Sequence, residues 1–167
     1  SSVALKLKDF DRVVSVQIND YLPSILMVSS DGMAVNVEYK TVPVTKRASG
    51  GVIGMSLNDK EKVIFASQVN TLDRVLVVTP EGNGKKFSLN ELPISARNRK
   101  GLKIVTGKEK VFAIISPIVT GEVVLQDKDK VYAVDVNDIT IQTRTSAGKP
   151  LIAKTKLTLK DVGLYLN

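Results

Sequence analysis

The chain has 167 residues, of which 43% are apolar and 25% are charged, a composition that excludes a disordered chain and allows one domain with its own core. No run of about 18 apolar residues is present, which argues against a transmembrane helix. Cysteine and histidine are absent, which excludes a disulfide framework, a histidine or cysteine zinc site, and a Ser-His or Cys-His nucleophile.

The predicted elements are short β-strands, because valine and isoleucine are abundant and helical periodicity is weak. In chain order, the apolar stretches ILMVSS and MAVNVEY flank Asp31-Gly32, which is the strongest signal for a two-residue hairpin. A strand around Val52–Leu57, a polar turn at Asn58–Lys60 and the strand KVIFASQV follow. This run of elements predicts a unit of four strands.

The unit recurs along the chain. A constant offset of 50 aligns Gly32 with Gly82, Pro43 with Pro93, Arg47 with Arg97 and Gly51 with Gly101. A weaker copy follows, in which Arg144 and Gly148 lie 47 positions after Arg97 and Gly101. The pattern R-x-x-x-G therefore occurs three times, as RASGG, RNRKG and RTSAG.

A period near 50 with four strands per unit predicts an all-β, propeller-like domain. We expect one domain over residues 1–167, with a partial closing repeat at 1–18, repeats at 19–69 and 70–119, and a degenerate repeat at 120–167. Three repeats and a fraction are fewer than a usual propeller has, so the ring is short, open or part of a larger one.

Positive charge is concentrated in the middle of the chain. The net charge is +7, and residues 74–110 hold nine basic residues against three acidic ones. Such a basic region favours a polyanionic partner. Aromatic residues are only 5% of the chain and tryptophan is absent, which favours duplex DNA over single strands or RNA that need stacking platforms.

The stretches LMVSSDGMAVNV, VPVTKRASGGVIGM and VLVVTPEGNGKKFSLNELPISARNRKGLKIV, and more loosely TIQTRTSAG, resemble the C-terminal domain of bacterial type IIA topoisomerase A subunits. This family comprises the A subunits of gyrase and of topoisomerase IV. The resemblance implies a β-pinwheel fold whose basic outer rim binds and bends double-stranded DNA. It also implies a non-catalytic part of an ATP-dependent enzyme. The partners implied are the B subunit, together with the remaining A-subunit domains, and the implied location is the bacterial cytoplasm, in association with the nucleoid.

Carried onto this sequence, the resemblance and the charge pattern predict DNA contacts on the repeated basic turns and the preceding hairpin. The candidate residues are Lys46, Arg47, Lys85, Lys86, Arg97, Arg99, Lys100, Lys103, Arg144 and Lys149. The glycine four residues after each arginine permits backbone N–H groups to approach phosphate in an anion-binding nest. In this family, gyrase A subunits carry a box of the type Gln-Arg-Arg-Gly-Gly-Lys-Gly, the gyrase box, which they use to wrap DNA with a defined hand. The segment Ala96–Gly101 resembles this box but lacks its glutamine and its double glycine, which favours topoisomerase IV.

Two other functions remain open at this point. A propeller-like protein-interaction module could place its basic face against an acidic partner. A free-standing enzyme could use carboxylates such as Asp59 or Asp135, although no spacing supports it. We expect no catalytic residue, metal or cofactor in this chain and no membrane partner.

Overall fold

The computed structural model describes residues 2–5, 14–17, 24–38, 56–95 and 100–166. The candidate residues Lys46, Arg47, Arg97 and Arg99 lie outside these ranges. The chain forms two compact units, which are described separately: residues 1–71 with 92–103, and residues 72–91 with 104–167. The prediction of an all-β chain is confirmed, because the described elements are strands and two short 3-10 helices.

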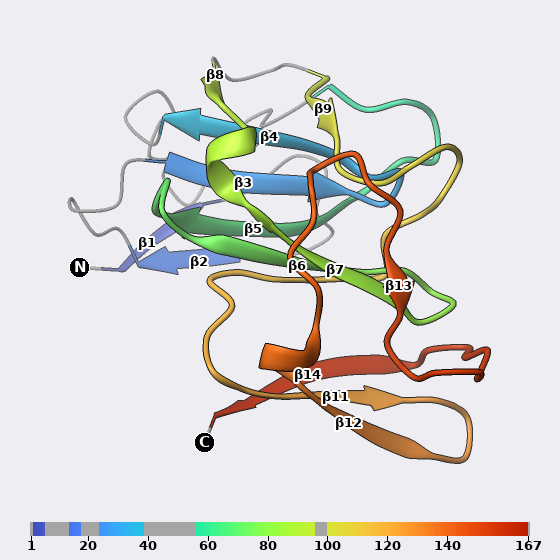
Figure 1. Cartoon of the computed structure of the whole chain (residues 1–167). Helices are drawn as coiled ribbons and strands as arrows, with labels where there is room; N and C mark the ends of the chain where they lie inside the picture. Colours follow the sequence, from blue (N-terminus) through green and yellow to red (C-terminus); the bar gives the residue numbers. More distant parts are fainter. Residues whose placement is uncertain (1, 6–13, 18–23, 39–55, 96–99, 167) are drawn as a thin grey trace. The chain divides into compact units, whose positions relative to one another are not determined.

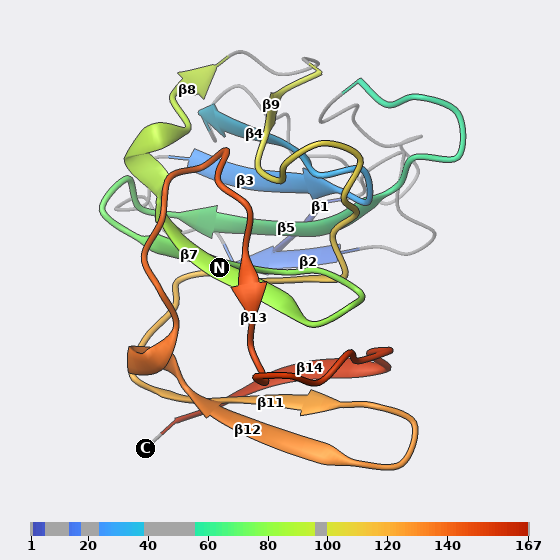
Figure 2. The same ribbon diagram turned by 45° about the vertical axis from the view of Figure 1, so that its right-hand side comes forward.

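The first unit contains two sheets (Figures 1 and 2). Strand β1 (Ser2–Leu5) pairs antiparallel with β2 (Val14–Gln17). The larger sheet has the order β5-β3-β4-β8, and β9 also pairs with β4. Its strands are β3 (Ser24–Ser29), β4 (Met33–Glu38), β5 (Val63–Val69), β8 (Ile94–Ser95) and β9 (Leu102–Lys103).

The second unit also contains two sheets. One has the order β10-β6-β7-β13 and the other the order β12-β11-β14. The strands of the first are β6 (Arg74–Val78), β7 (Asn83–Ser88), β10 (Ala113–Ile115) and β13 (Lys149–Pro150). Those of the other are β11 (Gly121–Gln126), β12 (Val131–Asp135) and β14 (Asp161–Leu166), and the 3-10 helices are η2 (Leu89–Glu91) and η3 (Val136–Asp138).

Hairpins join β3 to β4 and β6 to β7, as the sequence predicts. In each, a glycine N–H donates to the carbonyl three residues earlier: Gly32 to Ser29 and Gly82 to Thr79, both at 3.0 Å. The glycine φ angles are +78° and +88°, which other residues rarely adopt. Because Gly32 is the fourth residue of its turn and not a central one, the loop is longer than the predicted two-residue hairpin.

Each larger sheet is completed by a segment from the next sequence repeat. In the first sheet, Asn36 pairs with Ile94 in parallel and Ala34 with Leu102 in antiparallel orientation. In the second, Lys86 forms a parallel bridge with Ile141, and Gly84 pairs antiparallel with Lys149. We call the described residues 94–95 and 100–103 the first edge segment, and residues 141–150 the second edge segment.

Thus, in each of these two larger sheets, one edge is formed by a segment from the repeat that follows the one supplying the other strands. A sequence period shows where similar segments recur but not which sheet each segment completes. The repeat boundaries at 19–69, 70–119 and 120–167 therefore stay predictions about the sequence period, and the compact units follow a different division.

Each unit has its own apolar cluster. In the first, alternate residues of β3 and β4 pack together with β5: Ile25, Met27, Val35, Val37 and Val63. In the second, residues from β6 and β11 share one cluster, so the two sheets of this unit pack face to face: Leu76, Val78, Val123 and Leu125. Burying one such side chain contributes about 1.5–3 kcal/mol, so these clusters hold the sheets that carry the edge segments.

Candidate nucleic-acid interface

The first edge segment returns to β4 through Gly101. The φ angle of Gly101 is +89°, and a Cβ atom there would lie 2.3 Å from the carbonyl oxygen of Ala34. No side chain fits at that distance, so glycine is required for the backbone to approach β4. This agrees with the expected conformational role of the glycine in R-x-x-x-G.

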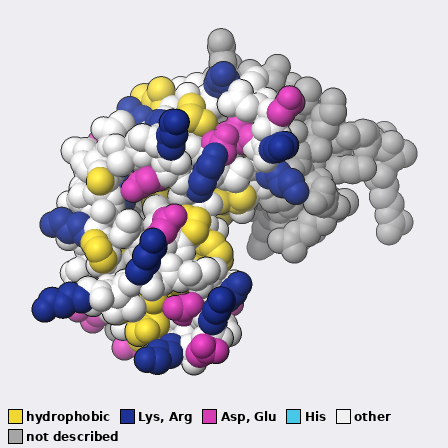
Figure 3. All heavy atoms as spheres, turned by 90° about the vertical axis from the view of Figure 1, so that its right-hand side faces the viewer, with side chains coloured by type: hydrophobic (Ala, Val, Ile, Leu, Met, Phe, Trp, Pro, Cys, Tyr) yellow, Lys and Arg dark blue, Asp and Glu magenta, His cyan; other side chains and the backbone are white. Residues whose placement is uncertain are grey.

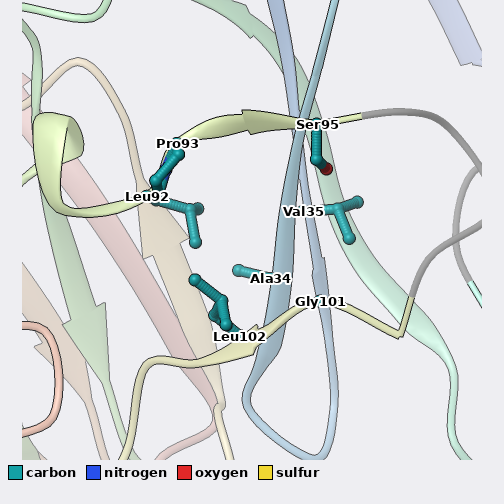
Figure 4. A pocket seen from close by; sticks show the side chains of 7 residues that line it. All are labelled: Ala34, Val35, Leu92, Pro93, Ser95, Gly101 and Leu102. Atoms are coloured by element: carbon teal, nitrogen blue, oxygen red, sulfur yellow. The ribbon is translucent and has the colours of Figure 1, made fainter.

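Beneath this segment lies an apolar pocket of about 370 Å³. Figure 4 shows the side chains of Leu92, Leu102 and Ala34 pointing toward one another, while the side chain of Val35 projects to the other side of β4. Phosphate is charged and strongly hydrated, so this lining does not suit it. An anion at this edge would have to be bound by the outward side chains, of which Lys100 is exposed and Lys103 is half-buried.

The second edge segment contains a compact turn that its own hydrogen bonds close. Ser146 N–H donates to the carbonyl of Thr143 at 3.2 Å, and the two side-chain hydroxyls of these residues are also hydrogen-bonded. The side-chain amide of Gln142 donates to the carbonyl of Ala147 at 2.8 Å. A Cβ atom on Gly148 would lie 3.1 Å from the carbonyl oxygen of Gly84, so here too the backbone approaches a strand closely.

Lys85 lies inside this turn. Its side chain is only 2% exposed, and its Nζ donates to three backbone carbonyls: Arg144 at 2.6 Å, Ser146 at 2.5 Å and Thr143 at 3.3 Å. Burial lowers the pKa of Lys85 from 10.5 to about 8, while nearby Glu109 and Glu91 oppose the shift and Arg144 adds to it. At neutral pH the ammonium therefore keeps its three donors.

Lys86 is also buried, with 6% exposure, and its Nζ donates to the carbonyl of Val136 at 2.7 Å. Burial lowers its pKa, with Arg74 adding to the shift and Asp135 opposing it. At the corresponding position of the first sheet, the side-chain amide of Asn36 donates to the carbonyl of Leu92.

The expected surface position of Lys85 and Lys86 is wrong. Successive residues of a strand point to opposite faces, and β7 lies inside its sheet with four consecutive residues buried. Both lysines are therefore enclosed, and their donors are used by the protein's own carbonyl groups.

The expectation of a phosphate-binding nest fails at the third R-x-x-x-G copy. The backbone N–H of Arg144 donates to Oε1 of Glu91 at 3.1 Å, so it does not point at an open anion site. The carbonyls of the turn converge on Lys85, which is the polarity opposite to that of a nest. The φ angle of Gly148 is not left-handed, and what this glycine permits is the close approach of the backbone to Gly84.

Four of the predicted contacts are described and accessible. Lys100 and Lys149 are exposed, and Lys103 and Arg144 are half-buried. Sequence reasoning missed Glu91 altogether and gave Lys85 the wrong environment. A signal was present for Lys85, because the 50-residue offset aligns it with Val35, an apolar strand residue.

The described surface carries both signs of charge. In Figure 3, Lys and Arg side chains lie beside Asp and Glu side chains on the face shown. Within the described ranges, no group of three or more His, Cys, Asp or Glu residues could hold a metal ion. Nor does any helix in the described part of the chain have the length and apolarity needed to cross a membrane.

Comparison with known proteins identifies the family. A family model described as the DNA gyrase C-terminal domain, beta-propeller, matches residues 23–70, 73–117 and 127–161. The chain belongs to this family. The predicted propeller-like fold is thereby confirmed, and so is the broader resemblance to the C-terminal domain of gyrase and topoisomerase IV A subunits.

Relatives and solved structures agree with this assignment to the gyrase C-terminal domain family. The DNA gyrase A subunit of Staphylococcus aureus strain MRSA252 is 28% identical over 156 residues, which cover 90% of this chain and 18% of that protein. The chain thus spans about a fifth of the length of the curated relatives it matches.

Two solved structures share the fold. The crystal structure of the C-terminal domain of DNA topoisomerase IV superposes with a TM-score of 0.78 at 19% identity, covering 92% of this chain and 49% of that one. The structure of the DNA gyrase A C-terminal domain gives a TM-score of 0.75 at 19% identity, covering 97% and 57%.

Proposed function

We propose that the chain binds and bends duplex DNA as part of the C-terminal domain of a type IIA topoisomerase A subunit. The observation that carries this proposal is the match of three successive segments to the gyrase C-terminal domain family. The basic charge of residues 74–110 supports it, because cations at repeated positions suit the regular line of phosphates on a duplex.

The proposed contacts are made to the phosphate backbone, so they position the DNA without reading its sequence. Arginine can place two donors on one phosphate, and lysine acts as a point charge. The residues proposed are Lys46, Arg47, Arg97, Arg99, Lys100, Lys103, Arg144 and Lys149. Lys85 and Lys86 are left out because their ammonium groups are buried and bonded to carbonyls.

Within this proposal the chain is a non-catalytic, DNA-handling part of an ATP-dependent topoisomerase. Bending a site of 20–30 base pairs costs on the order of 1–6 kcal/mol, which additional phosphate contacts must offset. The proposed partners of the chain are double-stranded DNA, the B subunit and the other domains of the A subunit. The proposed location is the bacterial cytoplasm. No cofactor is assigned to the chain.

Salt dependence of DNA binding tests the proposal. For a linear duplex of about 30 base pairs, we expect the logarithm of the binding constant to fall linearly with the logarithm of salt concentration, by about 0.9 for each phosphate neutralised. Two duplexes of unrelated sequence should bind alike. A flat salt plot, or capture of an acidic protein that survives nuclease treatment while DNA is not bound, would favour the protein-interaction alternative.

Between the two enzymes of the family, we propose the topoisomerase IV type. The support is the segment Ala96–Gly101, which lacks the glutamine and the double glycine of the gyrase box. Ligation of a nicked circle with bound protein tests this proposal. No trapped linking difference is expected, whereas a positive one would indicate chiral wrapping and a gyrase.

A further inference from the structure

We propose that Lys85 is a positioning residue that fixes the backbone of the second edge segment, so that Arg144 and Lys149 are held in one geometry for phosphate contact. This inference rests on the proposed function in DNA binding. Lys85 itself touches no DNA in this proposal, because its side chain is 2% exposed.

The geometry of the turn depends on the ammonium group. Three carbonyls within four consecutive residues, those of Thr143, Arg144 and Ser146, point at one nitrogen. An ammonium group has three donors, and all three are engaged. Without the ammonium group, the carbonyls of Arg144 and Ser146 would lose this donor, and that of Thr143 would keep the N–H of Ser146. The turn would then have to loosen for water to reach the two carbonyls.

The fold does not require a lysine at this position. Because Gly84 pairs with Lys149 as Ala34 pairs with Leu102, Lys85 corresponds to Val35 in the first sheet. Val35 packs in an apolar cluster and offers no donor to its edge segment. A buried lysine carries a desolvation cost that valine avoids, so its presence indicates a role beyond completing the strand.

Arg144 is held at both of its backbone groups. Glu91 accepts from its N–H at 3.1 Å, and Lys85 donates to its carbonyl at 2.6 Å. A side chain that starts from a fixed backbone loses less freedom when it binds, which is the advantage of preorganisation. Lys149 follows five residues later in β13, where pairing with Gly84 fixes it to the same strand that carries Lys85.

The charged groups facing Lys85 are Glu109, Glu91 and Arg144. The two carboxylates favour the ammonium form, and Glu91 also bonds the turn that the ammonium holds. Glu91 and Lys85 therefore act on opposite sides of one residue, and the loss of either is expected to loosen the same turn.

Lys85→Met is the main test variant, because methionine fills similar space without a donor. The matched control is Lys86→Met, which removes the neighbouring buried ammonium but leaves the turn alone, since Lys86 bonds Val136. Amide hydrogen exchange reports on the backbone without DNA. In Lys85→Met we expect the protection of the Arg144 and Ser146 amides to fall about tenfold or more, while that of Val75 and Val77 in β6 is unchanged.

Binding to a duplex of about 30 base pairs is the second readout. Lys85→Met is expected to weaken binding several-fold. It should have no added effect when Arg144 and Lys149 are already alanine, because nothing remains to be positioned. Lys86→Met should change neither turn protection nor affinity. If Lys85→Met folds poorly, Lys85→Val, which copies position 35, and Glu91→Ala, which removes the acceptor of the Arg144 N–H, test the same turn.

The outcomes are separable. Unchanged exchange at Arg144 and Ser146 would overturn the anchoring role, whatever happens to DNA affinity. Looser exchange with unchanged affinity, in a chain whose affinity does fall in Arg144→Ala, would overturn the positioning role. If neither the wild type nor any variant binds DNA, the proposed function fails, while the exchange data still decide whether Lys85 holds the turn.

Discussion

The two edge segments occupy the same register and are anchored by different chemistry. The first lies on β4 over Val35, Leu92 and an apolar pocket, and its glycine at 101 touches the strand backbone. The second lies on β7 with a lysine at the position of Val35, and that lysine bonds three of its carbonyls. One pairing scheme can therefore be stabilised by apolar packing or by a buried cation, without a change in strand order.

The two glycines provide the sharpest comparison. Gly101→Ala should lower the free energy of unfolding by about 4 kcal/mol. Alanine would have to adopt a left-handed φ there, and its Cβ atom would lie 2.3 Å from the carbonyl oxygen of Ala34. Gly148→Ala should cost about 1 kcal/mol, because its nearest contact is 3.1 Å and its φ is not left-handed. Urea unfolding of both variants measures the difference. Equal costs would show that the two close approaches are alike.

The buried lysine makes the second edge segment sensitive to pH. The pKa of Lys85 is about 8 in the folded chain and 10.5 ordinarily, so between these pH values the unfolded chain holds more protons. As the pH is raised from about 8 to 10.5, the free energy of unfolding of the wild type, relative to that of Lys85→Met, should therefore increase, by about 3 kcal/mol in total. Denaturant unfolding at several pH values measures it. A constant difference between the two proteins would contradict a buried, titrating ammonium.

The sequence Lys-Glu-Lys occurs before β5, with Glu61, and before β10, with Glu109, and the two glutamates lie in different environments. Glu61 is buried, accepts from the Ser29 hydroxyl, and accepts from the N–H of Asn58 at 2.8 Å. Glu61→Ala should destabilise the chain by about 2 kcal/mol, because two donors lose their partner. Glu109 is half-buried, so Glu109→Ala should cost less in a thermal melt. A larger cost at Glu109 would mean that its interaction with Lys85 dominates the second site.

The smallest expected effect concerns single exposed cations. Lys149→Ala and Lys100→Ala, one from each edge segment, should each weaken duplex binding uniformly across sequences and reduce the salt slope by about one. Binding measured across a salt series gives both quantities. A change in slope at only one of the two positions would show that only one edge segment contacts DNA.

Local signals in the sequence predicted much of the fold. Alternating valine and isoleucine predicted the strands, and Gly32 and Gly82 marked the turns, because both depend on preferences of a few adjacent residues. The repeat of R-x-x-x-G marked the positions of the edge segments along the chain. The family assignment confirms the propeller-like fold that these patterns predicted.

The environment of the lysines was decided by tertiary structure. Lys85 and Lys86 are basic residues in a basic stretch, and the only sign of burial in the sequence is the repeat alignment of Lys85 with the apolar Val35. What encloses Lys85 is a turn about 60 residues later, and what holds Arg144 is a carboxylate from η2. Burial depends on which segment packs over a strand, and that partner comes from the following repeat.

The sequence by itself therefore determined the strands, the turns, the repeat period and the excess of positive charge, all of which follow from local composition and spacing. Only the tertiary structure decided which sheet each edge segment completes, and which cations face solvent and which face carbonyls. The physical reason is that backbone preference acts over a few residues, whereas desolvation is set by whatever lies across the strand.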